Sequence, residues 1–144
     1  MNISNFKNPF FIGVAGVGMS AIAQYLQGIG MQVSGSDRYF HEGEYNKTKE
    51  QLENEGIKCF LQDGSGITAE TDLVVVSTAI EDTVYEVKKA KELGIPIIKR
   101  SQLLAMIAKS KKTIAVAGTS GKSTTSAMLF QILLDAGLEP SIIS

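Results

Sequence analysis

The chain has 144 residues, of which 44% are hydrophobic and 20% are charged. This length allows one α/β domain with its own core but leaves too little chain for two complete domains. Its 14 basic and 15 acidic residues give a net charge of -1, and neither sign forms a long block. The sequence therefore offers no electrostatic surface for nucleic acid or for an anionic membrane, and we expect small-molecule partners.

Cys59 is the only cysteine, so the chain forms no internal disulfide and has no cysteine pair to hold a metal. This usage is typical of a reducing compartment. The first residues lack a charged segment leading into an apolar stretch, and no apolar run reaches the length of about 18 residues that spans a bilayer. We expect a cytoplasmic protein that is neither exported nor inserted in a membrane.

From Pro9 onward, short apolar runs rich in β-branched and aromatic residues alternate with amphipathic stretches of helical length. This alternation predicts a Rossmann-like α/β fold, a parallel sheet with helices on both faces. The expected strands are residues 10–15, 32–36, 73–77, 95–98 and 113–117, with a short extra strand at 57–60. The expected helices are residues 19–29, 47–55, 84–93, 101–108 and 123–136.

A polar stretch at residues 109–112 separates the fourth predicted helix from a new strand. Such a break is typical of a domain boundary. We therefore predict one Rossmann-like domain over residues 1–110 and the beginning of a second, incomplete domain over residues 111–144.

The first strand runs into a glycine turn, Gly16-x-Gly18-x-x-Ala21, that opens the first helix. Small residues there allow a sharp turn and bring backbone N–H groups close to a diphosphate at the positive end of the helix. Asp37 follows at the end of the second strand, near the position at which dinucleotide sites bind a ribose. The turn predicts a nucleotide or diphosphate site, and by itself it also fits an NAD-dependent dehydrogenase or a regulatory Rossmann domain.

A second glycine motif, Gly-Thr-Ser-Gly-Lys-Ser-Thr, follows the predicted strand at residues 113–117 and precedes a long helix. In such a loop the backbone N–H groups surround phosphate oxygens, the lysine reaches the terminal phosphates, and the next hydroxyl binds Mg²⁺. Val116 replaces the first glycine of the usual eight-residue pattern, so the loop is a shortened variant. The residues expected to bind ATP are Gly118, Thr119, Ser120, Gly121, Lys122, Ser123 and Thr124, with Ser123 as the ligand of Mg²⁺.

A diphosphate-type turn in one Rossmann-like unit, followed by this phosphate loop, resembles the Mur ligase family of peptidoglycan synthesis. The resemblance extends over most of the chain, because further family motifs occur in order at residues 33–37, 74–80 and 95–96. It implies that residues 1–110 bind a UDP-sugar and that residues 111–144 begin the central ATP-binding domain. The positions that it assigns to the UDP-sugar are Gly16, Val17, Gly18, Met19, Ser20, Asp37, Ser77, Thr78, Ala79 and Ile80.

The resemblance also implies the reaction. Within the family, the motifs look most like those of members that join L-alanine to UDP-N-acetylmuramate in cell wall biogenesis. ATP would phosphorylate the lactyl carboxylate of the sugar, and the amine would attack the acyl phosphate to form an amide. Lys122 is the catalytic candidate, because its charge with that of Mg²⁺ would offset the charge on the transferring phosphoryl group.

Three departures leave the acceptor open, and one of them is the loop after Asp37, which carries Arg38-Tyr39-Phe40-His41-Glu42. Ser120 stands where alanine-adding members usually carry histidine, and residues 62–66 replace a histidine-containing segment of the family. A recycling ligase that attaches a whole peptide to the same sugar is the alternative within the family. His41 is expected to be an exposed loop residue, and Arg100 stands at a strand end within reach of a phosphate without an assigned role.

The helix at residues 123–136 is apolar on most sides, which is typical of a buried helix. We therefore expect it either to pack on the first domain or to mediate self-association. Because later residues of the family contribute to the ATP and amino acid sites, we expect the chain to bind UDP-sugar without catalysing ligation.

Overall fold

The computed structural model describes residues 1–78 and 83–143. Its centre is a five-stranded parallel sheet in the order β3-β2-β1-β4-β5. The strands are β1 (Pro9–Ile12), β2 (Ser34–Asp37), β3 (Lys58–Leu61), β4 (Leu73–Val76) and β5 (Ile97–Lys99). The order reverses direction at β1, since β2 and β3 lie on one side of it and β4 and β5 on the other. This arrangement confirms the predicted Rossmann-like parallel sheet.

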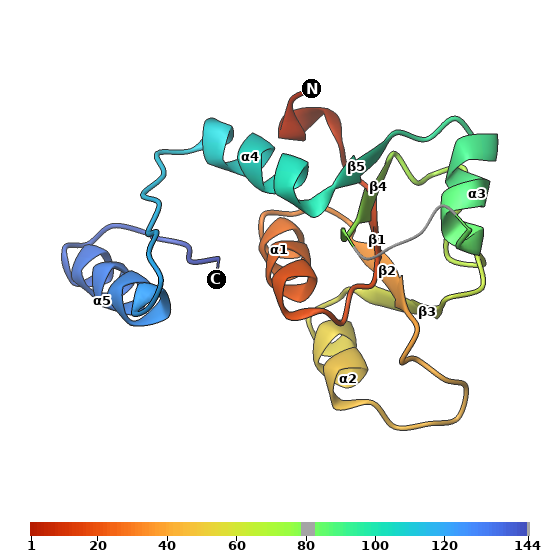
Figure 1. Cartoon of the computed structure of the whole chain (residues 1–144), viewed down its shortest axis with the longest axis horizontal. Coiled ribbons are helices and arrows are strands. Elements are labelled where there is room, and N and C mark those ends of the chain that lie inside the picture. The colour runs from red at the N-terminus through yellow and green to blue at the C-terminus, as the bar shows by residue number, and fades with distance from the viewer. Residues whose placement is uncertain (79–82, 144) are drawn as a thin grey trace.

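Helices cover both faces of the sheet, as the sequence predicted. Figure 1 shows α1, α2 and α4 on one face and α3 on the other. The bounds are η1 (Ile3–Asn5), α1 (Val17–Gly28), α2 (Lys47–Asn54), α3 (Tyr85–Glu92), α4 (Arg100–Ser110) and α5 (Lys122–Asp135). The predicted helix and strand bounds agree with these within a few residues, except for the last predicted strand.

Successive side chains of the central strands belong alternately to two separate hydrophobic clusters. Phe11 of β1 and Val75 of β4 join the cluster under α1 and α4, whereas Phe10 and Val74 join the cluster under α3. All four side chains are fully buried. A strand with both faces buried needs apolar residues at every position, which is why the β1 run Pro9–Ile12 lacks polar alternation.

Gly35 allows the turn after β1 to lie close against β2. A Cβ atom at this position would lie 2.7 Å from the carbonyl oxygen of Phe11 and 2.7 Å from the Cβ atom of Val14. No side chain fits in that space. The glycine therefore sets how closely the segment after β1 approaches the neighbouring strand.

The strand predicted at residues 113–117 is absent from the structure. These residues pair with no other strand in the described part of the chain, and Ile114 is 64% exposed. Because strands are held by hydrogen bonds to a neighbour, an apolar run without one does not form a strand. The sequence pattern was strand-like, but the partner that it requires is not among the described residues.

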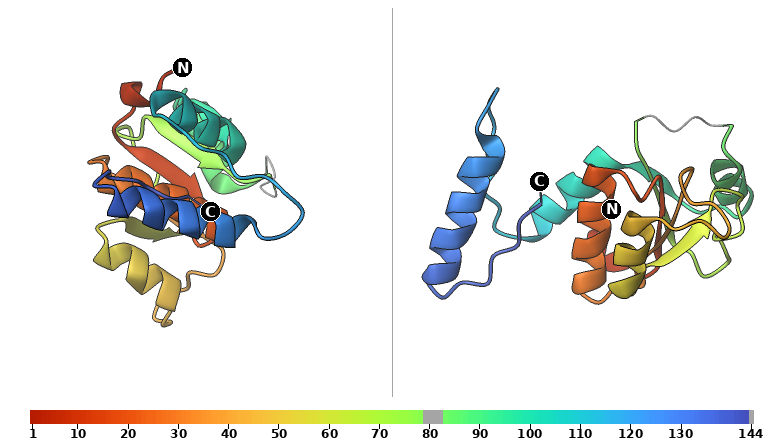
Figure 2. Two further views of the ribbon diagram at one scale, coloured as in Figure 1. Left: turned by 90° about the vertical axis from the view of Figure 1, so that its left-hand side faces the viewer. Right: turned by 90° about the horizontal axis from the view of Figure 1, so that it is seen from below.

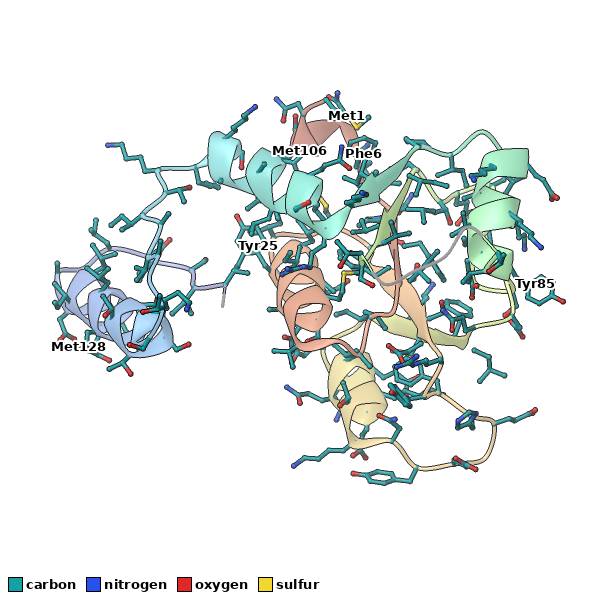
Figure 3. All side chains as sticks on the ribbon, viewed as in Figure 1. Met1, Phe6, Tyr25, Tyr85, Met106 and Met128 are labelled. Atoms are coloured by element: carbon teal, nitrogen blue, oxygen red, sulfur yellow. The ribbon has the colours of Figure 1, made fainter. Side chains whose placement is uncertain are left out.

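Helix α5 stands apart from the sheet domain (Figures 1 and 2) and has no buried residue. Figure 3 shows Met128 pointing away from the domain, and its side chain is 62% exposed. The expected packing of this helix on the first domain is therefore not what the structure shows. After α5 the chain returns toward the domain, and Ile143 packs against the core cluster.

Candidate functional site

The glycine turn is anchored to the end of β2. The N–H groups of Gly13 and Val14 both donate to the carbonyl oxygen of Ser36, at 2.8 and 3.0 Å. The chain then turns and enters α1 at Gly16, which caps the helix without a side-chain hydrogen bond. The start of α1 is thus held at the carboxyl ends of β1 and β2, where open α/β sheets bind ligands.

Two backbone donors are free at this helix start. The N–H groups of Met19 and Ser20 both donate to the carbonyl oxygen of Gly16, at 2.9 and 2.8 Å. The N–H groups of Val17 and Gly18 form no hydrogen bond within residues 1–78 and 83–143. Together with the partial positive charge of the helix end, they form a site for an anion.

The remaining predicted positions of the turn have other roles. The side chain of Met19 is 3% exposed and belongs to the core, and the Ser20 hydroxyl donates to the carbonyl oxygen of Val17 at 3.1 Å. Neither residue has a free backbone N–H. Of the positions from Gly16 to Ser20, the structure thus presents only the backbone of Val17 and Gly18 as free donors.

The carboxylate of Asp37 ties the turn to the loop after β2. Its Oδ2 accepts a hydrogen bond from the Ala15 N–H at 2.9 Å, and its Oδ1 accepts one from the Tyr39 N–H at 3.0 Å. The residue is 4% exposed. Both oxygens therefore have donors within the chain, and Asp37 holds the two loops that flank the site.

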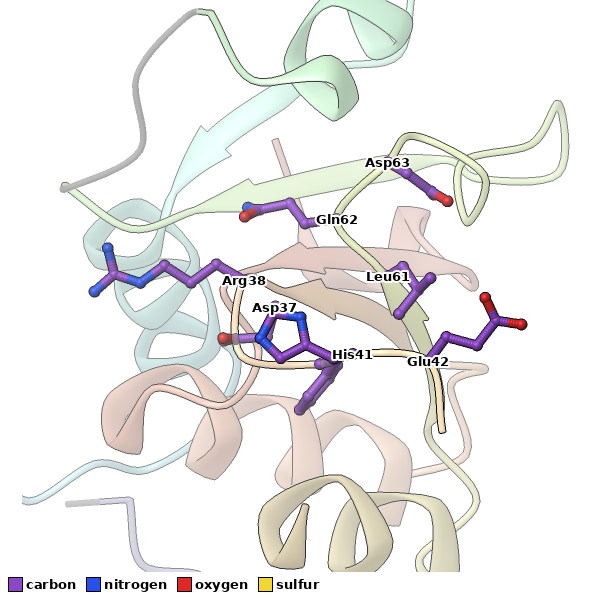
Figure 4. A pocket seen from close by; sticks show the side chains of 8 residues that line it. Asp37, Arg38, His41, Glu42, Leu61, Gln62 and Asp63 are labelled. Atoms are coloured by element: carbon purple, nitrogen blue, oxygen red, sulfur yellow. The ribbon is translucent and has the colours of Figure 1, made fainter. Parts of the chain in front are cut away.

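A cavity of about 360 Å³ opens beside Asp37, between the loops that follow β2 and β3 (Figure 4). Its size is at the lower end of the range of small-molecule sites. In Figure 4, the His41 ring lies near Asp37, whereas the Arg38 side chain extends away from the other labelled residues. The lining residues are Asp37, Arg38, Phe40, His41, Glu42, Leu61, Gln62 and Asp63.

The lining is more acidic than basic, with three carboxylates against one arginine. The Ser65 hydroxyl and N–H hydrogen-bond the Asp63 carboxylate and lower its pKa, so this group stays ionised at neutral pH. Such a lining repels a phosphate but suits a neutral group with many hydrogen-bonding atoms. A nucleoside in the cavity and its phosphates at the start of α1 would match this separation of charge.

The strand end of β4 lies beside β1 in the sheet and contributes Ser77 and Thr78. Ser77 is half-buried and Thr78 is exposed. Ala79 and Ile80, the other two residues predicted to close over the nucleotide, lie outside the described residues.

The phosphate loop has the backbone geometry of an anion site. Gly121 has φ of 75°, a left-handed conformation that favours glycine, and directly precedes α5. The N–H groups of residues 119–123 form no hydrogen bond within the described chain. Lys122 folds back over the loop, where its Nζ donates to the Gly118 carbonyl oxygen at 2.6 Å. Free N–H groups and a lysine around one loop fit the phosphates of a nucleotide.

The described residues contain no group of three or more His, Cys, Asp or Glu side chains that could hold a metal ion. Nor do they contain a helix with the length and apolarity needed to cross a bilayer. Ser123, at the start of α5, is the predicted Mg²⁺ ligand. A single hydroxyl fits the way Mg²⁺ is bound together with nucleotide phosphates, not in an all-protein cage.

A family model described as the Mur ligase family, catalytic domain, matches residues 10–112. The chain belongs to the Mur ligase family. It is 39% identical over 137 residues to UDP-N-acetylmuramate--L-alanine ligase of Dichelobacter nodosus, covering 95% of this chain and 28% of that protein. It is 45% identical over 133 residues to the enzyme of the same name from Carboxydothermus hydrogenoformans, covering 92% and 28%. The chain thus spans less than a third of the length of these curated relatives.

Solved structures of Mur ligases show the same fold. A UDP-N-acetylmuramate-alanine ligase of Thermotoga maritima superposes with a TM-score of 0.77 at 29% identity, over 92% of this chain and 30% of that one. A murein peptide ligase of Psychrobacter arcticus superposes with a TM-score of 0.78 at 30% identity, over 91% and 27%. A UDP-N-acetylmuramate-alanine ligase and a murein peptide ligase are therefore both among the structural neighbours.

The cavity is also lined by two residues, Gln62 and Asp63, to which the sequence assigned no role. Gln62 and Asp63 follow β3, whose carboxyl end lies beside that of β2 because the two strands pair in parallel. In the sequence, this segment was noted only because residues 62–66 replace a histidine-containing segment of the family. Its position after a strand was the available signal, but the order of strands in the sheet, which places it beside Asp37, is set by the fold.

Proposed function

We propose that this chain is the UDP-sugar-binding part of an ATP-dependent ligase that joins L-alanine to UDP-N-acetylmuramate in peptidoglycan precursor synthesis. The observation that carries the proposal is the pair of free N–H groups at Val17 and Gly18 beside the acidic cavity at Asp37. A diphosphate bound at the two N–H groups and a uridine bound in the cavity would use both features. The alanine-ligase names of the relatives support this choice of substrate.

In this proposal, the diphosphate accepts hydrogen bonds from the backbone of Val17 and Gly18, and α1 supplies the partial positive charge. Asp37 keeps the turn and the following loop in place through its two backbone hydrogen bonds. Ser77 and Thr78 lie at the neighbouring strand end, and together with Ala79 and Ile80 they would cover the nucleotide. The residue roles at Gly16, Met19 and Ser20 are limited to shaping the turn and the core.

We assign residues 1–110 to the UDP-sugar-binding domain and residues 111–144 to the beginning of the ATP-binding domain. The end of α4 at Ser110 supports this boundary, because the segment from there to Gly121 is neither helix nor strand. The reaction would take place in the cytoplasm, where ATP and nucleotide-linked sugars are available.

The chemistry that we propose for the full-length protein begins with transfer of the γ-phosphoryl group of ATP to the lactyl carboxylate of the sugar, which releases ADP. The amine of the acceptor then attacks the acyl carbon, the amide bond forms, and inorganic phosphate leaves. Lys122 would release the Gly118 carbonyl and bind the phosphates, and Ser123 would hold Mg²⁺. Bound Mg²⁺ would supply charge that offsets the phosphoryl oxygens.

Binding by the chain is tested by calorimetric titration with UDP-N-acetylmuramate, UMP and NAD. We expect binding of the two uridine compounds and none of NAD. Binding of NAD alone would replace the proposal with a nicotinamide-dependent dehydrogenase or a regulatory Rossmann domain. We also expect no ATP-dependent phosphate release by this chain with sugar and L-alanine, and measurable release would contradict the proposed lack of catalysis.

The second candidate is a ligase that attaches a whole peptide to the same sugar, which the structural similarity to a murein peptide ligase favours. Both candidates use the same UDP-sugar, so binding by this chain does not separate them. The full-length protein, assayed for phosphate release with L-alanine and with an L-alanyl peptide in turn, separates them. A higher kcat/KM with the peptide would favour the recycling ligase.

A further inference from the structure

Arg100 reaches from the first residue of α4 to the glycine turn. A Cβ atom built on Gly18 would lie 2.6 Å from Nη1 of Arg100, 3.2 Å from Cζ and 3.6 Å from Cδ. The arginine side chain therefore lies lengthwise over the Cα atom of Gly18, in the first turn of α1. Helices α1 and α4 cover the same face of the sheet (Figure 1), which brings two segments far apart in sequence together here.

The guanidinium of Arg100 has no partner among the described residues. No ion pair involving Arg100 is formed within the described residues, and its guanidinium donates no hydrogen bond to any of them. It lies beside the free N–H groups of Val17 and Gly18, at the positive end of the α1 dipole. A cation at this end of a helix is unfavourable unless an anion lies between them.

We propose that Arg100 is a diphosphate-binding residue and that Gly18 is glycine because the guanidinium of Arg100 lies against it. The assignment rests on the proposed binding of a UDP-sugar at the glycine turn. The diphosphate would accept hydrogen bonds from the backbone of Val17 and Gly18 on one side and from Arg100 on the other. A planar guanidinium can donate two parallel hydrogen bonds to phosphate oxygens, which an ammonium cannot.

The sequence alone gives Gly18 another explanation, since a glycine at this position of a Rossmann turn lets the backbone approach the pyrophosphate. The structure shows that the space beside Gly18 is filled by Arg100. The two explanations differ in one consequence. If the glycine accommodates Arg100, replacing it by alanine matters only while the arginine is present.

The experiment is a double-mutant cycle at Arg100 and Gly18, with UDP and uridine as the probes in titrations followed by NMR. We expect Arg100→Ala to weaken UDP binding by about tenfold or more, because a charge-assisted hydrogen bond is lost. Uridine, which has no phosphate, should bind with equal affinity to the Arg100→Ala protein and to the unaltered chain. Arg100→Lys should give an intermediate loss, and Lys109→Ala, at the other end of α4, should give none.

Gly18→Ala should weaken UDP binding in the unaltered chain and have a smaller effect in the Arg100→Ala background. Both variants are expected to fold, because Arg100 is exposed and alanine is favoured over glycine within a helix. Equal effects of Gly18→Ala in both backgrounds, or unchanged UDP binding by Arg100→Ala, would overturn the assignment alone. Absence of UDP binding by the unaltered chain would overturn the proposed function and this assignment with it.

Discussion

The carboxylate of Asp37 accepts a hydrogen bond from the backbone N–H of Ala15 at 2.9 Å, across 22 residues of sequence. Through its other oxygen it also accepts from the N–H of Tyr39. One side chain thus joins the turn that would bind the diphosphate to the loop that lines the cavity. The proposed site would therefore depend on a residue whose two hydrogen bonds, to Ala15 and Tyr39, are internal to the chain.

Asp37→Asn should therefore lower both stability and UDP affinity. The amide has one acceptor oxygen in place of two, so one of the two backbone N–H groups loses its partner. We expect a loss of about 1–3 kcal/mol in the free energy of unfolding, measured by urea denaturation.

Asp72 provides a matched control for this substitution. Its carboxylate also accepts from two backbone N–H groups, those of Lys7 at 2.6 Å and Asn8 at 3.0 Å, next to the start of β1. Asp72→Asn should lower stability to a similar extent and leave UDP affinity unchanged. Equal UDP affinity of the Asp37→Asn protein and the unaltered chain would show that Asp37 does not position the site.

Gly35→Ala should destabilise the sheet domain, because the new Cβ atom would overlap the Phe11 carbonyl oxygen and the Val14 side chain. Overpacking of this kind typically costs about 1–3 kcal/mol. Gly28→Ala is the control, since a Cβ atom at that helical position meets nothing within 4 Å. It should raise stability by about 0.5–1 kcal/mol. Thermal unfolding that ranks the two variants in the opposite order would contradict the close approach at Gly35.

Cys59 should be unreactive in the folded chain. Burial, with a smaller contribution from Glu53, raises the pKa of its thiol from 9.0 to about 12. Iodoacetamide at pH 8 is therefore expected to leave the folded protein unmodified and to alkylate it in urea, as read by mass spectrometry. Rapid alkylation without denaturant would refute this.

The same shift predicts the pH dependence of stability. Below pH 9 the thiol is neutral in both the folded and the unfolded chain, so it contributes nothing that varies with pH. Above pH 9 the unfolded thiol ionises first, and the unfolded state is favoured increasingly until about pH 12. Urea denaturation at pH 8 and pH 10 should show a smaller decrease in stability for Cys59→Ala than for the unaltered chain.

Helix α5 should mediate weak self-association of this chain. Met128 and Ile132 are 62% and 60% exposed, and no residue of the helix is buried. Exposed apolar side chains on one helix favour association. The mean mass in sedimentation equilibrium should rise with protein concentration. Ile132→Glu should reduce this rise, whereas Ile29→Glu, at an exposed position after α1, should not. A single monomer mass at all concentrations would contradict the prediction.

Local pattern was sufficient for most of the fold. The apolar run Leu73–Val76 marks a strand, and glycines mark the ends of the helices that they follow. These signals depend on the polarity of the side chains and on the backbone conformation of a few neighbouring residues. The segment at residues 113–117 shows the limit of such reasoning. Its composition is that of a strand, but a strand also needs a neighbour, which composition does not report.

The site divides in the same way. Both glycine motifs could be proposed from the sequence, because the conformations that bind phosphates need small residues at fixed spacing, and Asp37 could be proposed from its position at the end of a predicted strand. The free donors at Val17 and Gly18, by contrast, are known only once Met19 and Ser20 are seen to donate to Gly16. The roles of Gln62 and Asp63 depend on β3 pairing with β2, which brings their loop beside Asp37.

Membership of the Mur ligase family was thus readable from short motifs and their order, since each motif reflects local backbone chemistry. The contact between Arg100 and Gly18 was not, because 82 positions separate the two residues and only the packing of α1 and α4 on one face of the sheet brings them together. A motif is determined by residues that are close together in the sequence, whereas the neighbours of a charged side chain depend on how distant segments pack.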